Sequence, residues 1–261
     1  MKRSTKRRLW RGTLYAILAG AVAALAVVAD WGAIQENFFD RDVLESIWPD
    51  VITESAKNTI VYTFIAFSGG LVLAFVLALM KLSPVAPYRW IATSYIEFFR
   101  GLPVLIVIIA FAFAVPIAFS WNPPGGPRGA AVLALIVVAA AYMAETIRAG
   151  IQAVPKGQIE AAQSLGMNGL WTLMSVVLPQ AVRIVIPPLT NEFVLLLKDT
   201  SLIQAAGVGL GERELTNFAG DNLTANGNAT PLTVAAILYL VITLPLTRLV
   251  AYLERRTKRA R

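Results

Sequence analysis

The chain has no cysteine and no histidine among its 261 residues. Without cysteine it has neither a disulfide framework nor a thiol nucleophile, and without histidine it lacks the commonest general base and metal ligand. Charged residues are also scarce, at 15% of the chain against about 25% in soluble domains. No Gly-x-x-x-x-Gly-Lys-Ser/Thr loop for binding phosphates occurs. These absences predict a protein that is not an enzyme and that holds neither a metal nor a cofactor of its own.

Apolar sequence is what the chain has in excess, with 57% hydrophobic residues and a mean hydropathy of +0.64. The formal charge of +7 comes mainly from the two ends, because Met1–Arg11 holds six Lys or Arg residues and the last seven residues hold five. Basic ends around an apolar middle are typical of a protein in a lipid bilayer. The sequence therefore predicts a membrane protein and no binding of nucleic acid.

Six segments are long and apolar enough to cross a bilayer core of about 30 Å as helices. An all-α integral membrane fold follows. The predicted spans are Leu9–Trp31, Asn58–Met80, Gly101–Trp121, Gly129–Ile151, Ile184–Leu210 and Leu232–Leu253. The first span also fits a cleaved signal peptide, with Ala24-Leu25-Ala26 as its small-x-small site. Its apolar run continues to Ala29, which favours a retained anchor.

Basic residues gather on one side of these spans. If the N-terminus lies inside, the inner segments carry 18 of the 23 Lys and Arg residues, and the outer loops collect acids such as Glu212, Glu214 and Asp221. The positive-inside rule then places both termini in the cytoplasm. Four regions are expected: residues 1–31 as an anchor with a basic start, 32–57 as an acidic outer loop that forms a surface helix, 58–253 as a helical core, and 254–261 as a basic tail.

The inner loop 152–183 is too long for a simple connector between packed helices. Pro155 suits the first turn of a helix, and Gly166 suits the left-handed residue after its end. Asn168 is a good cap for a second helix, which Pro179 is expected to end. The loop therefore predicts a pair of short helices on the cytoplasmic side.

The faces of these two helices leave two interpretations open. Ile159, Ala162 and Gly166 share one stripe of the first helix, where the backbone of another protein can approach closely. The second helix carries an apolar face that includes Leu170 and Trp171. The pair is either a docking element for a partner protein or an amphipathic structure lying on the inner leaflet.

Four ordered motifs resemble a known family. The run Glu160-Ala161-Ala162, with Gly166 and Leu178-Pro179 beyond it, resembles the EAA loop of ABC importer permeases. Three further runs are similar to the polar amino-acid uptake branch of that family: Glu97–Pro103 (EFFRGLP), Ala144–Ile151 (AETIRAGI), and Pro187–Phe193 (PPLTNEF) leading to Lys198–Leu202 (KDTSL). The similarity extends from about residue 53 to about residue 252.

This resemblance implies a MetI-like permease fold, with five core helices and one additional N-terminal helix. The EAA loop would form a cytoplasmic coupling helix that sits on a separate ABC ATPase subunit, which binds ATP and magnesium. Its positions in this chain are Pro155, Glu160, Ala161, Ala162, Gly166 and Pro179. The other implied partners are a second permease subunit, identical or homologous, and an extracytoplasmic solute-binding protein. The location would be the plasma (inner) membrane of a bacterium.

Charged residues within a predicted span mark a path or a packing contact, because a charge in the bilayer centre costs at least about 2.5 kcal/mol. Glu192 and Asp199 are seven residues apart and share one helix face, whereas Lys198 points elsewhere. One interpretation places these charges, with Thr200 and Ser201, along a hydrated path for a zwitterionic solute. The other pairs them with neighbouring helices. Pro187 and Pro188 indicate a partly unwound entry to this span.

Two further acid–base pairs lie at inner membrane boundaries. Glu97 and Arg100 are three residues apart, as are Glu145 and Arg148, and this helical spacing permits a local ion pair. A structural role is favoured for both pairs, and a role in an inner gate is the alternative.

Together these features predict a permease subunit of an ATP-driven importer for polar L-amino acids. The glutamate, glutamine and aspartate group is favoured, and arginine, histidine and lysine are the alternative. An ion-coupled carrier or channel is a weaker alternative. An intramembrane enzyme is weaker still, because the chain has neither a Gly-x-Ser-x-Gly nor a His-Glu-x-x-His motif.

Overall fold

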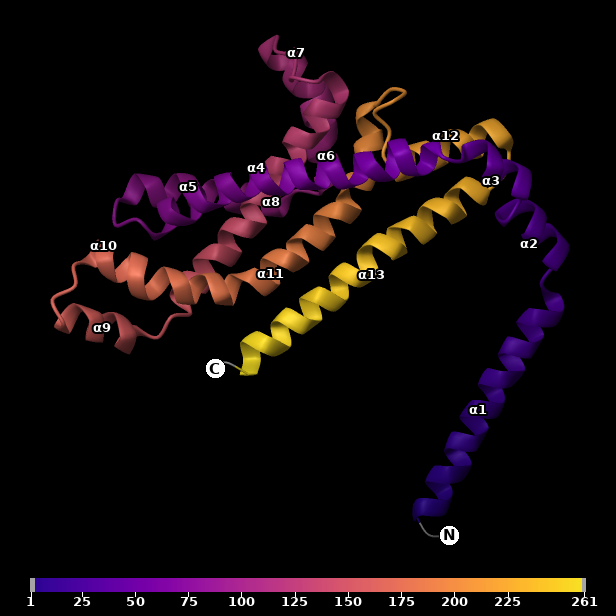
Figure 1. Cartoon of the computed structure of the whole chain (residues 1–261), viewed down its shortest axis with the longest axis horizontal. Coiled ribbons are helices and arrows are strands. Elements are labelled where there is room, and N and C mark those ends of the chain that lie inside the picture. Colours follow the sequence, from indigo (N-terminus) through magenta and orange to yellow (C-terminus); the bar gives the residue numbers. More distant parts are fainter. Residues whose placement is uncertain (1–2, 260–261) are drawn as a thin grey trace.

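The computed structural model describes the backbone of residues 3–259 and the side chains of residues 10–256, and this part of the chain forms helices and no strands. Figure 1 shows an elongated bundle with one helix, α1, splayed away from it. The elements are α1 (Arg3–Val28), α2 (Trp31–Phe38), α3 (Arg41–Ile47), the π-helix η1 (Val51–Ala56), α4 (Lys57–Leu82), α5 (Ala86–Gly101), α6 (Val104–Ile109), the π-helix η2 (Ala110–Ala114), α7 (Val115–Phe119), α8 (Gly126–Gln152), α9 (Lys156–Ser164), α10 (Gly169–Thr172), the π-helix η3 (Leu173–Val177), α11 (Leu178–Asp199), the 3-10 helix η4 (Thr200–Ala206), α12 (Leu215–Asn226) and α13 (Thr230–Arg259).

The predicted all-α membrane fold is confirmed. Five helical stretches of the described chain are long and apolar enough to cross a bilayer, and a bent pair gives a sixth candidate. That pair is α5 with the run Val104–Phe119, which meet at an angle of 106°. Leu102 and Pro103 form the break, because proline has no N–H to continue the first helix and the residue before it disfavours helical geometry.

Small side chains hold α4 and α8 close together at the centre of the bundle. A Cβ atom at Gly69 would meet Ile136 Cδ1 at 2.9 Å, and one at Gly70 would meet Met143 Cε at 2.8 Å. Buried alanines line the facing side of α8, including Ala140. Close backbone approach of this kind is how helices associate within lipid, where there is no hydrophobic driving force between them.

The fifth span differs from the prediction in three ways. The span is longer than predicted, since Gly169–Ala206 forms one candidate span. Glu192, Lys198 and Asp199 all lie within α11 and do not interrupt it. Pro179 does not end a helix but lies in the first turn of α11, directly after the π-helix η3, where a missing N–H costs nothing. Pro187 and Pro188 lie inside α11 without unwinding it, because α8 and α13 pack against this helix and hold it.

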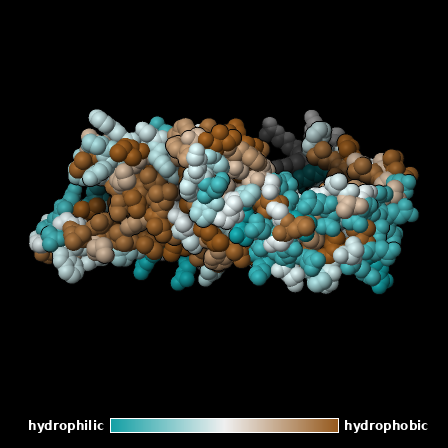
Figure 2. Space-filling view, turned by 90° about the horizontal axis from the view of Figure 1, so that it is seen from above, coloured by the Kyte–Doolittle hydropathy of each residue, from teal (hydrophilic) through white to brown (hydrophobic). Residues whose placement is uncertain are grey.

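Short helices cover the two ends of the bundle. α9 and α10 lie at one end of its long axis, and α2, α3 and α12 lie at the other (Figure 1). The sequence predicted one surface helix for residues 32–57, whereas the structure has α2, α3 and η1, and α12 was not predicted. Figure 2 shows apolar side chains gathered over the middle of the bundle and hydrophilic ones over the α12 end. The 18-residue window of α1 has no buried residue, so α1 contributes nothing to the core.

Candidate functional site

A cavity of about 310 Å³ lies between α6, α8 and α11 in the apolar part of the bundle. Glu192 and Asp199 both line it, so the seven-residue spacing does place the two carboxylates on one face of α11. The remaining lining residues are apolar apart from one tyrosine: Val104, Leu135, Val138, Ala139, Tyr142, Leu195 and Leu196. An apolar pocket with a few convergent polar groups is the usual form of a binding site for a small molecule.

A positive charge lies next to this cavity. The guanidinium carbon of Arg100 is 5.5 Å from the centre of the Tyr142 ring, and the Tyr142 hydroxyl donates a hydrogen bond of 3.4 Å to the Arg100 carbonyl. Two carboxylates and a nearby guanidinium are complementary to a solute that carries both an ammonium and a carboxylate group. The cavity lining therefore carries two carboxylates, and the guanidinium of Arg100 lies beside one lining residue, Tyr142.

The other residues predicted along the path lie outside the cavity lining. Lys198 is exposed on another face of α11. Thr200 is buried, and its hydroxyl donates to the Leu197 carbonyl at 2.6 Å, so the side chain is used within its own helix turn. Ser201 is half-buried in η4. Of the predicted path residues on α11 and η4, only the two acids reach the cavity.

The local ion pair that the spacing of Glu97 and Arg100 permits does not form among the described residues. Arg100 instead lies over the ring of Tyr142, which comes from α8. A partner 42 residues away in sequence thus competes for the guanidinium with the local acid. Spacing within one helix carries no information about such a partner.

The ion pair between Glu145 and Arg148 is confirmed and has a third member. Arg148 Nε donates to both carboxylate oxygens of Glu145, at 3.0 and 3.1 Å, and Arg148 also donates to Gln152. Lys81 Nζ lies 3.0 Å from Glu145 Oε2, which joins the end of α4 to α8. This arrangement supports the structural interpretation of the pair, because Glu145 connects two core helices.

We expect Glu145→Gln to destabilise the core without changing the cavity. The substitution leaves the Lys81 and Arg148 charges half-buried without their carboxylate, which costs about 1–3 kcal/mol. The measurement is the thermal melting of the protein in detergent. The double variant Lys81→Met/Glu145→Gln is the control and should recover part of the loss. An unchanged melting temperature in the single variant would contradict the structural role.

Of the predicted coupling positions, three lie on α9, two flank it and Pro179 lies in α11. Pro155 immediately precedes α9, and Gly166 follows its end with a φ of +82°, the left-handed conformation predicted for it. Asn168 caps α10, as predicted, since its Oδ1 accepts a hydrogen bond of 2.9 Å from the Trp171 N–H. The capping signals in the sequence therefore identified this helix pair correctly, apart from the role of Pro179.

Two of the three residues of the predicted stripe face their own chain. Ala162 is buried, and Ile159 packs against the cluster of Val154, Val177 and Ala181, whereas Gly166 is exposed. Glu160 and Ala161 lie on the exposed face of α9. The Glu160 carboxylate has no hydrogen-bond or ion-pair partner among the described residues. The face of α9 that carries Glu160 is therefore the one open to a partner.

Large apolar side chains are exposed beside Glu160. Leu165 is 85% exposed, and Leu170 and Trp171 on α10 are 71% and 63% exposed. Helical spacing in the sequence predicts that Leu170 and Trp171 share an apolar face, but it does not predict the exposure of Leu165. The sequence feature that indicates this exposure is the position of Leu165 directly before the left-handed Gly166. Exposed apolar patches mark a surface that contacts another protein or a membrane, so both interpretations of the helix pair remain compatible with these residues.

Glu214 is a buried acid that sequence analysis had placed on the surface. Its side chain is completely buried, and it caps α12 by accepting hydrogen bonds from the N–H groups of Thr216 and Asn217. The Tyr239 hydroxyl donates to it at 2.8 Å. Burial raises the pKa of Glu214 above its ordinary value, and these three hydrogen bonds oppose the rise. The signal in the sequence is its position immediately before the apolar-periodic run of α12.

Comparisons with known proteins agree with this geometry. Residues 70–259 match the family described as binding-protein-dependent transport system inner membrane component. The chain is 37% identical to the probable glutamine ABC transporter permease protein GlnM of Bacillus subtilis, over 78% of this chain and 91% of that protein. It is 34% identical to the L-cystine transport system permease protein TcyB of the same organism, over 90% of this chain and 94% of that protein.

A solved structure is similar as well. The crystal structure of an amino acid ABC transporter with histidines superposes on 82% of this chain and 96% of its own, with a TM-score of 0.72 and 35% sequence identity. The family match, over residues 70–259, covers the sequence that lines the cavity and the sequence of α9 and α10. The similar solved structure shows that the overall fold is shared.

Proposed function

The chain belongs to the family of binding-protein-dependent transport system inner membrane components, and from this membership we propose that it is the membrane permease subunit of an ATP-driven ABC importer for polar L-amino acids. The observation that carries the proposal is the helical run Gly169–Ala206. This run begins with α10, which follows α9 after a short turn, and its other half bears Glu192 and Asp199 in the cavity. A continuous helix thus links a surface suited to a partner protein with a cavity suited to a zwitterion.

The transport mechanism is alternating access. An ATPase subunit binds ATP and magnesium, and its closure moves α9 through the exposed face around Glu160. The movement passes along Gly169–Ala206 and changes the side of the membrane to which the cavity opens. No bond is made or broken in this chain, which is not an enzyme.

The assembly contains three other kinds of protein. Two ABC ATPase subunits dock at the α9–α10 end, which faces the cytoplasm together with both termini. A second permease chain, identical or homologous, completes the membrane part. An extracytoplasmic solute-binding protein delivers the amino acid at the α12 end. The location is a bacterial inner membrane, and the basic residues at both ends of the chain support this orientation.

The substrate is a polar amino acid whose ammonium group pairs with Glu192 and Asp199 and whose carboxylate lies toward Arg100. The relatives named above are described as a glutamine permease and an L-cystine permease, which supports a neutral or acidic polar substrate. We therefore favour the glutamate, glutamine and aspartate group. Two carboxylates in the cavity, and a solved relative that holds histidines, support the basic amino acids as the alternative.

Reconstitution of the whole assembly in liposomes tests the proposal. Radiolabelled glutamine, glutamate and arginine are offered in parallel outside the vesicles, with and without ATP inside. We expect uptake of at least one of them that requires ATP, the ATPase subunit and the binding protein together. Uptake that persists without the ATPase subunit would instead favour an ion-coupled carrier or channel.

A further inference from the structure

Residues 207–214, here called the connecting segment, join η4 to α12 at the α12 end of the bundle. Gly207 and Gly211 have φ angles of +76° and +79°, a backbone conformation that residues other than glycine rarely adopt. A Cβ atom at either glycine would meet nothing within 4 Å, so the backbone angle and not crowding requires glycine there. Leu210 between them is 81% exposed. Val208 is buried in the apolar core with Leu135 and Leu196, so apolar packing holds the start of the segment but not its part beyond Gly209.

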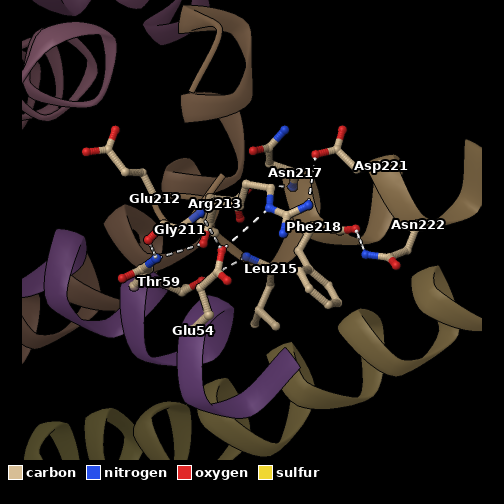
Figure 3. A network of polar contacts seen from close by, with 12 residues as sticks. Glu54, Thr59, Gly211, Glu212, Arg213, Leu215, Asn217, Phe218, Asp221 and Asn222 are labelled. Atoms are coloured by element: carbon tan, nitrogen blue, oxygen red, sulfur yellow. Dashed lines mark hydrogen bonds and ion pairs between the residues drawn. The ribbon is translucent and has the colours of Figure 1, made fainter. Parts of the chain in front are cut away.

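Side chains of α4 hold the end of the connecting segment instead (Figure 3). The Asn58 side-chain amide donates to the carbonyls of Gly211 and Arg213, at 3.2 and 3.0 Å. The Tyr62 hydroxyl donates to the Glu212 carbonyl at 2.8 Å. Just beyond the segment, the Leu215 N–H donates to the Thr59 hydroxyl at 3.1 Å. Successive backbone groups are thus bound by one helix face.

Ion pairs add to these hydrogen bonds. Glu54 Oε1 accepts from the Gly211 N–H at 3.1 Å and lies 3.5 Å from Arg213 Nε. The Arg213 side chain is only 14% exposed, and its guanidinium carbon lies 5.1 Å from the centre of the Phe218 ring. Arg128 at the start of α8 pairs with Glu212 at 3.0 Å. Polar contacts of this kind are directional, and they are lost together when the two sides move apart.

The position of the segment connects these contacts with the cavity. Asp199 lines the cavity and is followed directly by η4, which packs against α4, α6, α8, α11 and α12. α4 and α8 form the most extensive helix contact of the bundle, and we refer to them as the α4–α8 body. Any movement of α11 relative to that body must therefore strain or release the contacts between the connecting segment and α4.

We propose that the connecting segment is a latch between α11 and the α4–α8 body, and that it releases from α4 in each transport cycle. Glu54, Asn58 and Arg213 are the positioning residues that hold it closed. The left-handed Gly211, which lies beyond the buried Val208, lets the backbone of residues 211–214 swing when the contacts are lost. This inference rests on the proposed transport function, because only alternating access requires α11 to move.

Covalent closure of the latch tests the inference, and the natural absence of cysteine makes the chain a clean background. The double variant Glu54→Cys/Arg213→Cys is assembled with its ATPase subunits and binding protein in liposomes. A short bis-methanethiosulfonate reagent links the two thiols, and a reductant releases them. We expect the linked protein to lose uptake of its radiolabelled amino acid at least about tenfold and to regain it on reduction, because a bistable element held in one state cannot cycle.

Two further variants make the result decisive. Arg128→Cys/Glu212→Cys joins the segment to α8 and should block uptake in the same reversible way, even if the first pair is inactive before linking. Arg41→Cys/Glu45→Cys joins two residues of α3 whose side chains already meet, with Arg41 Nε 2.9 Å from Glu45 Oε1. Linking these two thiols should therefore change uptake less than about twofold. Undiminished uptake with the segment fully linked to α4 or α8 would overturn the latch. Absence of ATP-driven uptake in the unsubstituted chain would instead overturn the transport function itself.

Discussion

Glu160→Lys is expected to abolish ATP-driven uptake while leaving the chain folded in the membrane. The Glu160 side chain is exposed on α9 and has no partner among the described residues, so its replacement removes no internal contact. Leu165 after α9 and Trp171 on α10 are exposed apolar side chains of the same helix pair. A charge reversal inside an interface costs several kcal/mol, because a like charge then faces the partner. This cost predicts a loss of uptake of at least about tenfold.

Transport assays and thermal melting together distinguish a loss of coupling to the ATPase from a loss of folding. Uptake of the radiolabelled amino acid and ATP hydrolysis stimulated by the binding protein should both fall in Glu160→Lys, whereas the thermal melting of the isolated chain should not. The amount of ATPase subunit that co-purifies with the permease should fall in parallel. These three readouts follow directly from placing the partner on the exposed face of α9.

Gln35→Lys is the matched control, since it adds a positive charge to an exposed position on α2, at the opposite end of the bundle from α9. Uptake in this variant should remain within about twofold of the unsubstituted chain, as is usual for surface changes. Normal uptake in Glu160→Lys would show that the ATPase touches some other surface. Equal loss in both variants would show that an added positive charge lowers uptake wherever it is placed.

The membrane fold was largely predictable because lipid imposes a simple selection on the sequence. A span must be apolar over its whole length, so the segments starting near residues 58, 129 and 232 correspond closely to α4, α8 and α13. Local backbone chemistry was equally informative at Gly166 and Asn168, where a left-handed residue and a helix cap follow from single side chains.

The features that the sequence did not predict share one physical cause. Each of them is set by a contact with a residue distant in the sequence. The contact of Arg100 with Tyr142 replaces a local ion pair, and the packing of Ile159 against its own chain hides part of a stripe that a partner was expected to cover. Pro187 fits inside α11 only because neighbouring helices support it. Helical periodicity gives the face of a residue but not the element that the face meets.

Part of the cavity could be predicted from helical spacing, and part required the tertiary structure. The spacing of Glu192 and Asp199 correctly gave a common face, because seven residues make almost two whole helical turns. That Tyr142 of α8 stands opposite them, with Arg100 above its ring, required the tertiary arrangement of three helices. The charges alone left a packing role and a transport role open, and only the cavity between the helices favours the second.

We expect Glu192→Gln and Asp199→Asn each to raise the KM for uptake at least about tenfold. The reason is that removing one member of a buried charge pair costs roughly 2–5 kcal/mol, and here the lost partner is the ammonium group of the solute. A packing role predicts something different: the protein would melt at a lower temperature and the KM of the surviving protein would stay unchanged. Both carboxylates line an otherwise apolar cavity, so neither amide can restore the missing charge.

The KM is measured for the amino acid identified by reconstitution, alongside the melting temperature of each variant in detergent. Glu254→Gln is the matched control, because it neutralises an exposed carboxylate near the end of α13, far along the chain from the cavity, and should leave KM unchanged. A raised KM at normal melting temperature supports the contact with the solute. A lowered melting temperature with unchanged KM would assign Glu192 and Asp199 to helix packing, and the cavity would then have lost the charges that fit it to a zwitterion.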